Sequence, residues 1–207
     1  MRRCVIVGGA PIGRAEEIRR YLREDDFFIY CDCGLRHADA LGRQPDLIVG
    51  DFDSHENPRA AVETIVLPHE KDDTDSFFAA KEALRRGFRD FLLLGVVGAR
   101  LDHTLGNLGL ALMLHAAGAN ALIVDDFSEM EIVSTEAEIA PRFPYFSLIN
   151  LDGSAGEITV SGAKFPLAGA ALPCESSLGV SNEPLPGQTA RVRVGRGRLL
   201  LIRVRNA

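Results

Sequence analysis

The sequence predicts an α/β N-terminal domain, with a mainly parallel sheet and flanking helices, followed by an all-β C-terminal sandwich domain. Up to about residue 124, short apolar runs alternate with helical patterns, which is typical of parallel strands joined by crossover helices. After Asp125 and Asp126 the pattern changes to short alternating segments separated by Gly, Pro, Ser and Asn, which is typical of antiparallel strands. A chain of 207 residues suits one or two domains, since domains commonly contain roughly 100 to 200 residues.

Six strands and two helices are expected in the first domain. The strand candidates are the apolar runs at residues 4–7, 27–30, 47–49, 64–67, 91–94 and 121–124. A helix is expected over 75–86, because Phe77, Ala80 and Leu84 recur on one face. A second helix is expected over 102–117; it is apolar on nearly all sides, which predicts deep packing.

The second domain is expected to contain strands at residues 145–151, 157–160, 191–194 and 199–204. The boundary falls between residues 126 and 142, and Pro141 and Pro144 lie close to the junction. We therefore expect domains at residues 1–126 and 143–207.

Composition favours a cytoplasmic protein with small-molecule or protein partners. A formal net charge of -6 and a pI near 5.4 argue against nucleic acid as a partner, because nucleic-acid binders usually carry a basic face. No apolar stretch approaches the roughly 18 residues of a membrane span, and the N-terminal apolar run is too short for a signal peptide. The four cysteines fit neither a disulfide framework nor a zinc site, and we expect mostly buried, reduced thiols.

The densest chemical pattern lies at residues 44–54, where an apolar strand runs into Gly50 and then into Asp51 and Asp53. Open α/β sheets bind ligands at the carboxyl ends of their strands. Mg²⁺ is usually held by one or two carboxylates together with substrate phosphates, so Asp51 and Asp53 are candidate ligands. A turn with Asx-type hydrogen bonds explains the pattern equally well.

A second acidic group, Lys71, Asp72, Asp73, Thr74 and Asp75, stands where a helix begins. Helix capping and the helix dipole account for one or two of these carboxylates. Three acids in four residues repel one another unless a cation or hydrogen-bond donors lie among them. A shared Mg²⁺, with Lys71 facing phosphate, is the more specific interpretation.

A third group follows the strand at 91–94, where Arg100, Asp102 and His103 open the second helix. The N–H groups of a helix start and an arginine suit a phosphate. The alternative is an ordinary loop with Asp102 as the helix cap, and for His103 this alternative is preferred.

Glycines recur at other strand ends. Gly8 and Gly9 close the first strand, as a loop that approaches a nucleotide would, and Asp32 with Gly34 follows the second. The first loop matches neither the dinucleotide fingerprint nor the lysine-bearing phosphate loop. Four strand ends that each carry Gly with Asp or Arg nevertheless indicate one shared site.

Along nearly its whole length the chain resembles thiamine pyrophosphokinases. The matching stretches are 32–34, 45–54, 71–75, 100–107, 161–167 and 179–183. The resemblance implies an α/β nucleotide-binding catalytic domain, a β-sandwich that helps to bind thiamine, and a homodimer with shared active sites. It implies transfer of the diphosphate of ATP to the thiamine hydroxyl, giving thiamine diphosphate and AMP.

The resemblance also implies roles for residues. Asp51, Asp53 and Asp75 match the stretches that hold Mg²⁺ and ATP phosphates, Arg100 and Asp102 match the stretch that completes the ATP site, and Ser181 and Asn182 match a pair that faces thiamine. The remaining residues that we expect at the ligand sites are Gly9, Asp32, Gly34, Lys71, Asp72, Thr74, His103 and Asn107.

The chain departs from the family pattern at three places. Cys33 stands where a second glycine is common, Gly98-Ala99 replaces a double glycine, and Phe165 stands where tyrosine is frequent. Three alternative functions remain: diphosphate transfer to another hydroxymethyl heterocycle such as a pterin, a metal-dependent glycosyltransferase, and a non-catalytic nucleotide or thiamine sensor. The catalytic base is left unassigned.

Overall fold

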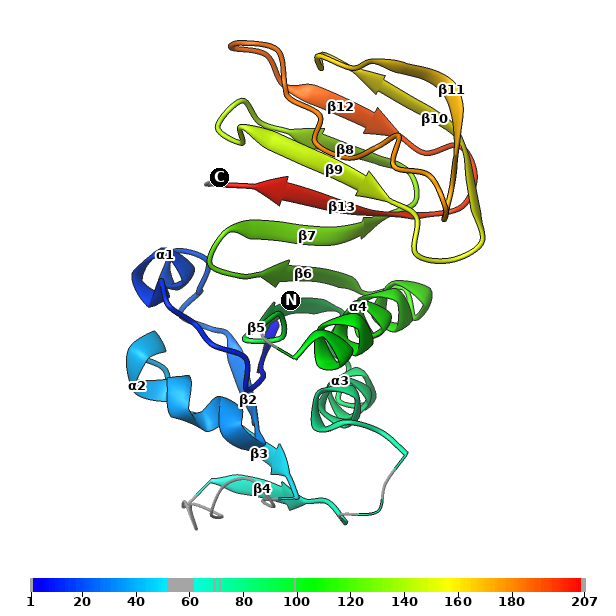
Figure 1. Ribbon diagram of the computed structural model, residues 1–207. Coiled ribbons are helices and arrows are strands. Elements are labelled where there is room, and N and C mark those ends of the chain that lie inside the picture. Colours follow the sequence, from blue (N-terminus) through cyan, green and yellow to red (C-terminus); the bar gives the residue numbers. More distant parts are fainter. Residues whose placement is uncertain (1, 52–61, 69, 71, 99, 206–207) are drawn as a thin grey trace. The chain divides into compact units, whose positions relative to one another are not determined.

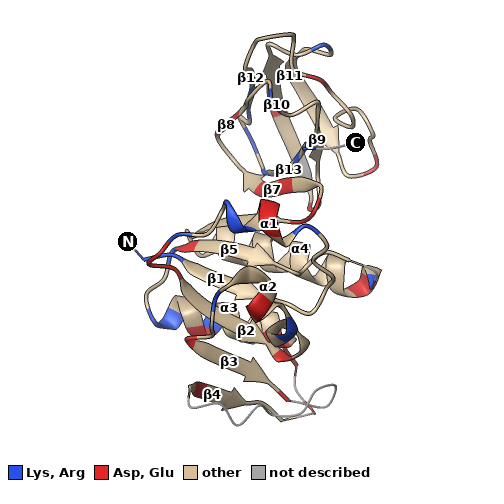
Figure 2. Cartoon of the chain, turned by 90° about the vertical axis from the view of Figure 1, so that its left-hand side faces the viewer, with Lys and Arg blue, Asp and Glu red and all other residues tan. Residues whose placement is uncertain are grey.

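The structure is a computed structural model that describes residues 2–51, 62–68, 70, 72–98 and 100–205 (Figure 1). The chain divides into two compact units, Met1–Asp126 and Phe127–Ala207. Lys and Arg residues are interspersed with Asp and Glu residues over the elements of both units (Figure 2). Among the described residues, no helix combines the length and the apolar character needed to cross a membrane.

The first unit contains a parallel sheet in which the strands follow the order β4-β3-β2-β1-β5-β6. The strands are β1 (Cys4–Val7), β2 (Phe27–Cys31), β3 (Leu47–Gly50), β4 (Glu63–Val66), β5 (Asp90–Leu94) and β6 (Asn120–Val124). The central residues of β1, β2, β3 and β5 are buried, as expected for inner strands of a parallel sheet covered on both faces, whereas β4 at the edge of the sheet is partly exposed. All six predicted strands are confirmed, with ends shifted by a residue or less.

Helices cover both faces of this sheet (Figure 1). They are α1 (Ala15–Arg19), the 3-10 helix η1 (Asp32–His37), α2 (Ala38–Leu41), α3 (Asp75–Arg85) and α4 (Leu101–Ala116). On one face, Ile18 of α1 and Leu41 of α2 pack against side chains of β1, β2 and β5. On the other, α3 buries Ala79, Ala80 and Ala83, whose small side chains permit close approach to the strands.

The predicted deep packing of the second helix is wrong for its first turns. Leu101 and Leu105 at the start of α4 are 67% and 58% exposed. The buried face of α4 is formed by Asn107, Leu110 and Leu114, and at 100° per residue the two exposed leucines lie on the opposite side of the helix. An apolar sequence alone does not show which face is covered.

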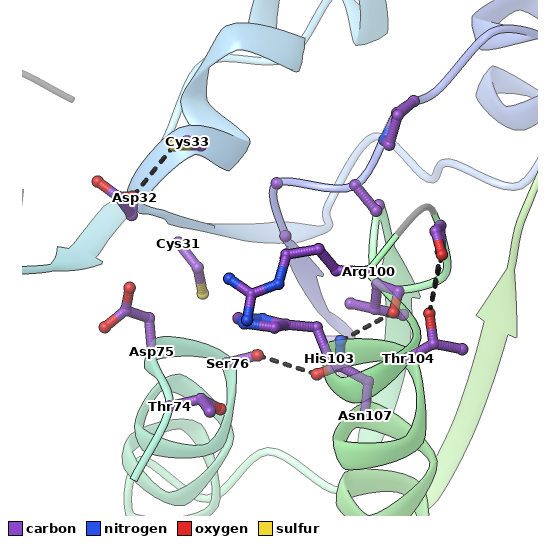
Figure 3. A pocket seen from close by; sticks show the side chains of 17 residues that line it. Cys31, Asp32, Cys33, Thr74, Asp75, Ser76, Arg100, His103, Thr104 and Asn107 are labelled. Atoms are coloured by element: carbon purple, nitrogen blue, oxygen red, sulfur yellow. Dashed lines mark hydrogen bonds between the residues drawn. The ribbon is translucent and has the colours of Figure 1, made fainter. Parts of the chain in front are cut away.

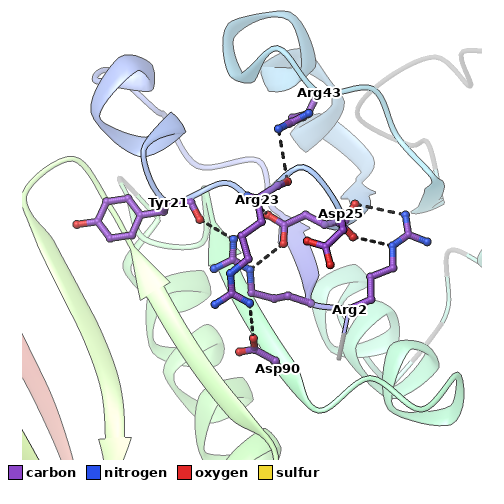
Figure 4. A network of polar contacts seen from close by, with 8 residues as sticks. Arg2, Tyr21, Arg23, Asp25, Arg43 and Asp90 are labelled. Atoms are coloured by element: carbon purple, nitrogen blue, oxygen red, sulfur yellow. Dashed lines mark hydrogen bonds and ion pairs between the residues drawn. The ribbon is translucent and has the colours of Figure 1, made fainter.

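The amino ends of the strands carry ion pairs. The Arg3 side chain, 6% exposed, donates from Nε to Asp26 Oδ1 at 2.9 Å and from Nη2 to Oδ2 at 2.7 Å. Nearby, Arg23 pairs with Asp90 at 2.9 Å (Figure 4). The Arg3–Asp26 pair is buried and therefore costly to break on one side only, whereas the Arg23–Asp90 pair is largely exposed. Together the two pairs join the starts of β1, β2 and β5. The carboxyl ends of the same strands are left to form a site.

The second unit consists of two antiparallel sheets, ordered β7-β13-β9 and β11-β10-β12-β8. The strands are β7 (Ser128–Val133), β8 (Glu136–Ile139), β9 (Tyr145–Ile149), β10 (Ser154–Ser161), β11 (Leu167–Pro173), β12 (Ala190–Arg193) and β13 (Leu199–Val204). Side chains such as Phe146, Ile158 and Leu201 form its core, as in a sandwich.

The expected start of the second domain at residue 143 differs from the structure. The second unit begins at Phe127, because β7 pairs with β13 and β8 pairs with β12. Both early strands carry several charged residues, which hides the alternating apolar pattern.

Candidate active site

A cavity of about 390 Å³ lies at the carboxyl edge of the parallel sheet (Figure 3). The strands β2, β3 and β4 extend the sheet on one side of β1, whereas β5 and β6 extend it on the other side. The strand order therefore reverses beside β1, and such a switch point opens a crevice where α/β proteins bind ligands. The cavity is lined by residues that follow β1, β2 and β5 and by the first turns of α3 and α4.

Glycines allow the loop after β1 to pack tightly against the loop after β5. The Gly8 N–H donates to Leu94 O and the Ala10 N–H to Gly95 O, both at 2.8 Å. A Cβ on Gly8 would stand 2.6 Å from Gly95 O, and one on Gly9 would stand 3.0 Å from Cys33 Cβ. The backbone at Gly8 and Gly9 thus borders the cavity without a covering side chain.

The 3-10 helix η1 holds the same loop from outside. His37 Nε2 lies 2.9 Å from Ala10 O, and the Arg36 guanidinium donates to Gly9 O. Burial is the main cause that lowers the pKa of His37, so the neutral ring that donates to Ala10 O is favoured. Gly34 has no Cβ that would overlap the Val7 carbonyl, which lets η1 pack directly on β1.

Asp32, directly after β2, has an unusual conformation and an unsatisfied oxygen. Its φ of 41° lies in the left-handed region that non-glycine residues seldom adopt. Oδ2 lies 3.1 Å from Cys33 Sγ, whereas Oδ1 is buried and lacks a hydrogen-bond partner within the described part of the chain. A buried acceptor in that state suits a cation or a bound donor.

Asp51 directly follows β3, and the end of this strand lies beside Asp32. A Cβ on the preceding Gly50 would lie 3.2 Å from the Asp32 Cα and Cβ atoms. Glycine is therefore needed for β3 to approach the Asp32 backbone. This packing brings the chain at Asp51 close to the turn that carries Asp32.

The acidic stretch before α3 separates into different environments. Thr74 caps α3, and its Oγ1 accepts from the Phe77 N–H at 3.4 Å. Thr74 and Asp75 line the cavity. Asp73 instead binds Lys81 Nζ at 2.7 Å and 2.8 Å, and Asp72 is exposed. Lys81 thus supplies a positive charge beside Asp73. The local sequence pattern did not indicate this lysine as the partner.

The loop between β5 and α4 places Arg100 on the cavity, and the first turn of α4 places His103 and Thr104 there. Thr104 Oγ1 lies 3.1 Å from Gly98 N and 3.3 Å from Gly98 O, which closes the loop. Asp102 does not cap the helix, because α4 begins at Leu101 with Arg100 at the cap position. Its carboxylate pairs with Arg100, and this hydrogen bond is the largest cause that lowers the pKa of Asp102 to about 2.

The predicted ATP and metal residues are partly brought together. Those that line the cavity are Gly9, Asp32, Thr74, Asp75, Arg100, His103 and Asn107. Gly34 is buried beneath the loop after β1, whereas Asp72 and Asp102 are exposed and do not contribute to the lining. Lys71 and Asp53 lie outside the described residues.

Two polar lining residues were not predicted. Ser76 and Thr104 line the cavity, and their hydroxyl groups bind Asn107 and Gly98. Ser76 stands next to Asp75 and Thr104 lies within the 100–107 stretch, so their positions beside charged candidates were the available signal. Cys31 also lines the cavity; Cys4 and Cys31 are buried as expected, but Cys174 is exposed.

The residues present fit Mg²⁺. Across the described ranges no three His, Cys, Asp or Glu side chains form a cluster suited to a metal. Mg²⁺ needs only one or two carboxylates when phosphate oxygens supply further ligands. Asp75 lines the cavity, and the buried Oδ1 of Asp32 lacks a hydrogen-bond partner in the described chain. Oxygen atoms of this type are the ligands that Mg²⁺ prefers.

In the second unit, Ser181 and Asn182 differ in exposure. Ser181 is exposed with a φ of 58°, and its N–H donates to Ser147 Oγ at 3.0 Å. Asn182 is 6% exposed. Its Oδ1 accepts from the Phe165 N–H at 3.0 Å and its Nδ2 donates to Phe165 O at 2.8 Å. The amide therefore fixes the segment that carries Phe165, whose side chain is 56% exposed.

Comparison with known proteins matches both units. The family model for the thiamin pyrophosphokinase catalytic domain matches residues 18–123, and the model for the thiamin pyrophosphokinase vitamin B1 binding domain matches residues 129–199. The thiamine pyrophosphokinase of Bacillus subtilis is 27% identical over 212 residues, covering 98% of this chain and 99% of that protein.

Solved structures agree over the whole chain. The crystal structure of the Bacillus subtilis thiamine pyrophosphokinase has a TM-score of 0.87 at 25% identity and covers 100% of both chains. That of the Geobacillus thermodenitrificans thiamin pyrophosphokinase has a TM-score of 0.83 at 28% identity, covering 99% of this chain and 98% of the other. The Candida albicans enzyme, 11% identical with a TM-score of 0.78 over 98% and 89% of the two chains, shares the fold. With a catalytic-domain model that matches more than half of its 207 residues, the chain belongs to the thiamin pyrophosphokinase family.

Proposed function

We propose that this protein transfers the terminal diphosphate of ATP to the hydroxyl group of thiamine, producing thiamine diphosphate and AMP. The observation that carries the proposal is the switch-point cavity, which combines an uncovered glycine backbone, the carboxylates of Asp32 and Asp75, and Arg100. Membership of the thiamin pyrophosphokinase family, with a vitamin B1 binding domain matched at 129–199, favours thiamine as the acceptor over a pterin or a sugar. Family membership also favours an enzyme over a non-catalytic sensor.

In this reaction the thiamine oxygen forms a bond to the β-phosphorus of ATP. The bond between that phosphorus and the oxygen bridging to the α-phosphorus breaks, and AMP leaves with this oxygen. The hydroxyl proton passes to a base that we leave unassigned. Most of the barrier to such a transfer is lowered by positioning the reactants and by neutralising charge on phosphate oxygens.

The chain's own residues supply these functions. The backbone at Gly8 and Gly9 allows phosphate to approach closely. Arg100, whose guanidinium can bind two phosphate oxygens at once, would exchange its contact with Asp102 for the nucleotide. Lys71 would contribute a second positive charge. Thr104 and η1 hold the two cavity loops in the geometry that this binding requires.

Mg²⁺ would be held by Asp51, Asp53 and Asp75, and the unsatisfied oxygen of Asp32 is a further candidate ligand. When bound, Mg²⁺ neutralises charge that develops on the phosphate oxygens. Without it, the clustered carboxylates would repel the nucleotide, so the same residues would disfavour metal-free ATP.

Thiamine would be recognised by the second unit. Ser181 presents an exposed side chain, and the neighbouring ring of Phe165 offers an aromatic surface. Lys164 Nζ lies 5.6 Å from the centre of this ring and binds Glu183 at 2.8 Å. We further propose a cytoplasmic homodimer in which each active site combines the first unit of one subunit with the second unit of its partner.

An acceptor panel tests the proposed function. Purified protein is incubated with ATP and Mg²⁺, and with thiamine, a hydroxymethyl pterin or no acceptor, and AMP is measured. We expect AMP to form when the acceptor is thiamine, and not with the pterin or without an acceptor. AMP formation with the pterin but not with thiamine would contradict the proposal, and so would the absence of AMP with every acceptor.

A further inference from the structure

Asn107 connects three parts of the cavity wall, although its side chain is almost inaccessible. The residue lies in α4 and is 8% exposed. Its Nδ2 donates to Val96 O in the loop after β5 at 2.8 Å. Its Oδ1 accepts from Ser76 Oγ in the first turn of α3 at 3.0 Å (Figure 3). Both polar atoms of the amide are therefore engaged by protein groups.

The first turn of α3 is the part of this wall that carries a candidate metal ligand. Asp75 precedes Ser76 directly and lines the cavity. The Ser76 hydroxyl ties that turn to α4, and Asn107 in turn ties α4 to the β5 loop. A small displacement of groups that hold a reacting phosphate is costly, since errors of about 1 Å can lower rates roughly 100-fold.

We propose that Asn107 is a positioning residue that acts through Ser76 to set the placement of Asp75, rather than a residue that contacts ATP. This inference rests on the proposed function for the identity of the ligand, an ATP–Mg²⁺ complex. The buried amide holds the Asp75 carboxylate where Mg²⁺ and the β-phosphate of ATP would meet it. The Ser76 hydroxyl links this amide to α3.

Ser76→Ala removes that link and leaves Asn107 on Val96 O. The measurement is the affinity of the full-length protein for a non-hydrolysable ATP analogue, by calorimetry, with Mg²⁺ and again with a chelator. With Mg²⁺ we expect about fivefold weaker binding, the factor that corresponds to one hydrogen bond. With the chelator we expect no loss, because neither the wild type nor the variant then has a contact between Asp75 and a metal. The displaced Asp75 carboxylate repels metal-free nucleotide no more strongly than before.

Further variants separate positioning from general destabilisation. Ser76→Thr retains a hydroxyl group and should bind like the wild type. Ser76→Ala combined with Asn107→Ala should bind no more weakly than Asn107→Ala alone, because the two residues act as one unit. Asn150 is the matched control: it is 6% exposed, and its Nδ2 donates to Leu172 O at 2.7 Å in the second unit. Asn150→Ala should lower the melting temperature without changing analogue affinity.

The outcomes are distinct. Wild-type affinity in Ser76→Ala would overturn the inference, as would an equal loss with chelator present or equal weakening by Asn150→Ala. If Asn107→Ala does not fold, the Ser76 variants decide alone. Wild-type protein that binds the analogue but releases no AMP with thiamine would refute the proposed function, and the affinities would still decide the role of Asn107. Wild-type protein that does not bind the analogue would overturn both.

Discussion

The guanidinium of Arg100 is held against the carboxylate of Asp102, with Arg100 Nε 3.2 Å from Asp102 Oδ1. Both side chains are mainly exposed, at 71% and 65%; they lie at the start of α4, where Arg100 lines the cavity. The positive charge of Arg100 is thus balanced by a neighbour, and in the proposed reaction a phosphate would compete for it. Exchange of one anion for another would limit the electrostatic cost of binding and release.

The pair predicts a shifted titration. Asp102, whose ordinary pKa is 3.8, has its pKa lowered to about 2 chiefly by the hydrogen bond from Arg100. A lowered pKa in the folded state means that the stabilisation is present above pH 3.8 and is lost as the pH falls toward 2. Arg100→Gln should return the Asp102 pKa to near 3.8. Carboxyl-carbon NMR titration of both proteins measures this, and an unchanged Asp102 midpoint would exclude the pair.

Arg100→Ala should lower kcat/KM for ATP about 100-fold, because a charge-assisted contact to phosphate oxygens is lost in a partly enclosed site. Arg198→Ala is the matched control, since it breaks an exposed ion pair with Asp152 in the second unit. It should leave the ATP parameters unchanged. Steady-state kinetics with thiamine at saturation distinguish the two variants. If kcat/KM for ATP falls no further in Arg100→Ala than in Arg198→Ala, Arg100 does not contribute to the ATP site.

The fold was largely predictable, because buried parallel strands have continuous apolar sequences. The runs at β1 and β5 identify those strands almost to the residue. The strands β7, β8 and β11 were not predicted. Charged residues interrupt the first two, and β11, Leu-Ala-Gly-Ala-Ala-Leu-Pro, lacks the β-branched and aromatic residues typical of strands. Its place is set by pairing with β10, which no local pattern reveals.

The candidate site was predictable where residues follow strands. Asp32, Asp75 and Arg100 line one cavity because the strand order brings the ends of β2 and β5 to either side of β1. The pairing of Asp73 with Lys81, eight residues away in sequence, was not predicted. Nor was the burial of Asn107 and Asn182, because an amide that contacts a ligand and one that fastens a loop have the same sequence signal.

The acidic stretch before α3 allows a test with neighbouring residues. Asp75→Asn should abolish diphosphate transfer while the melting temperature stays the same or rises, since the carboxylates of Asp32 and Asp75, which line the same cavity, repel one another when no metal is bound. Asp51→Asn and Asp53→Asn should behave alike. Asp73→Asn, which removes the partner of Lys81 outside the cavity, should retain most activity. AMP release and thermal melts are measured on each protein; near-normal turnover in Asp75→Asn would refute its metal role.

The proposed homodimer predicts complementation between two defective chains. Asp75→Asn and Ser181→Ala, assayed with limiting thiamine, should each show low activity. In a mixed dimer with shared sites, one site carries both lesions and the other carries none. A twofold dimer has two equivalent sites, so random pairing restores roughly a quarter of wild-type activity.

The two chains are coexpressed with different tags, and mixed dimers are isolated before assay, which raises the expected activity to roughly half of the wild-type value. Sites that lie within single chains would leave one lesion in every site. Mixed dimers without any gain over the separate variants would therefore contradict the shared site.

The central claim is that a diphosphate group, rather than a single phosphate, moves from ATP to thiamine. The most direct measurement uses ATP labelled at the β-phosphorus, with Mg²⁺, thiamine and the purified protein, and follows the label by chromatography. We predict that thiamine diphosphate acquires the label and that unlabelled AMP forms in equal amount. Labelled ADP together with thiamine monophosphate, or labelled inorganic products without any thiamine ester, would contradict it.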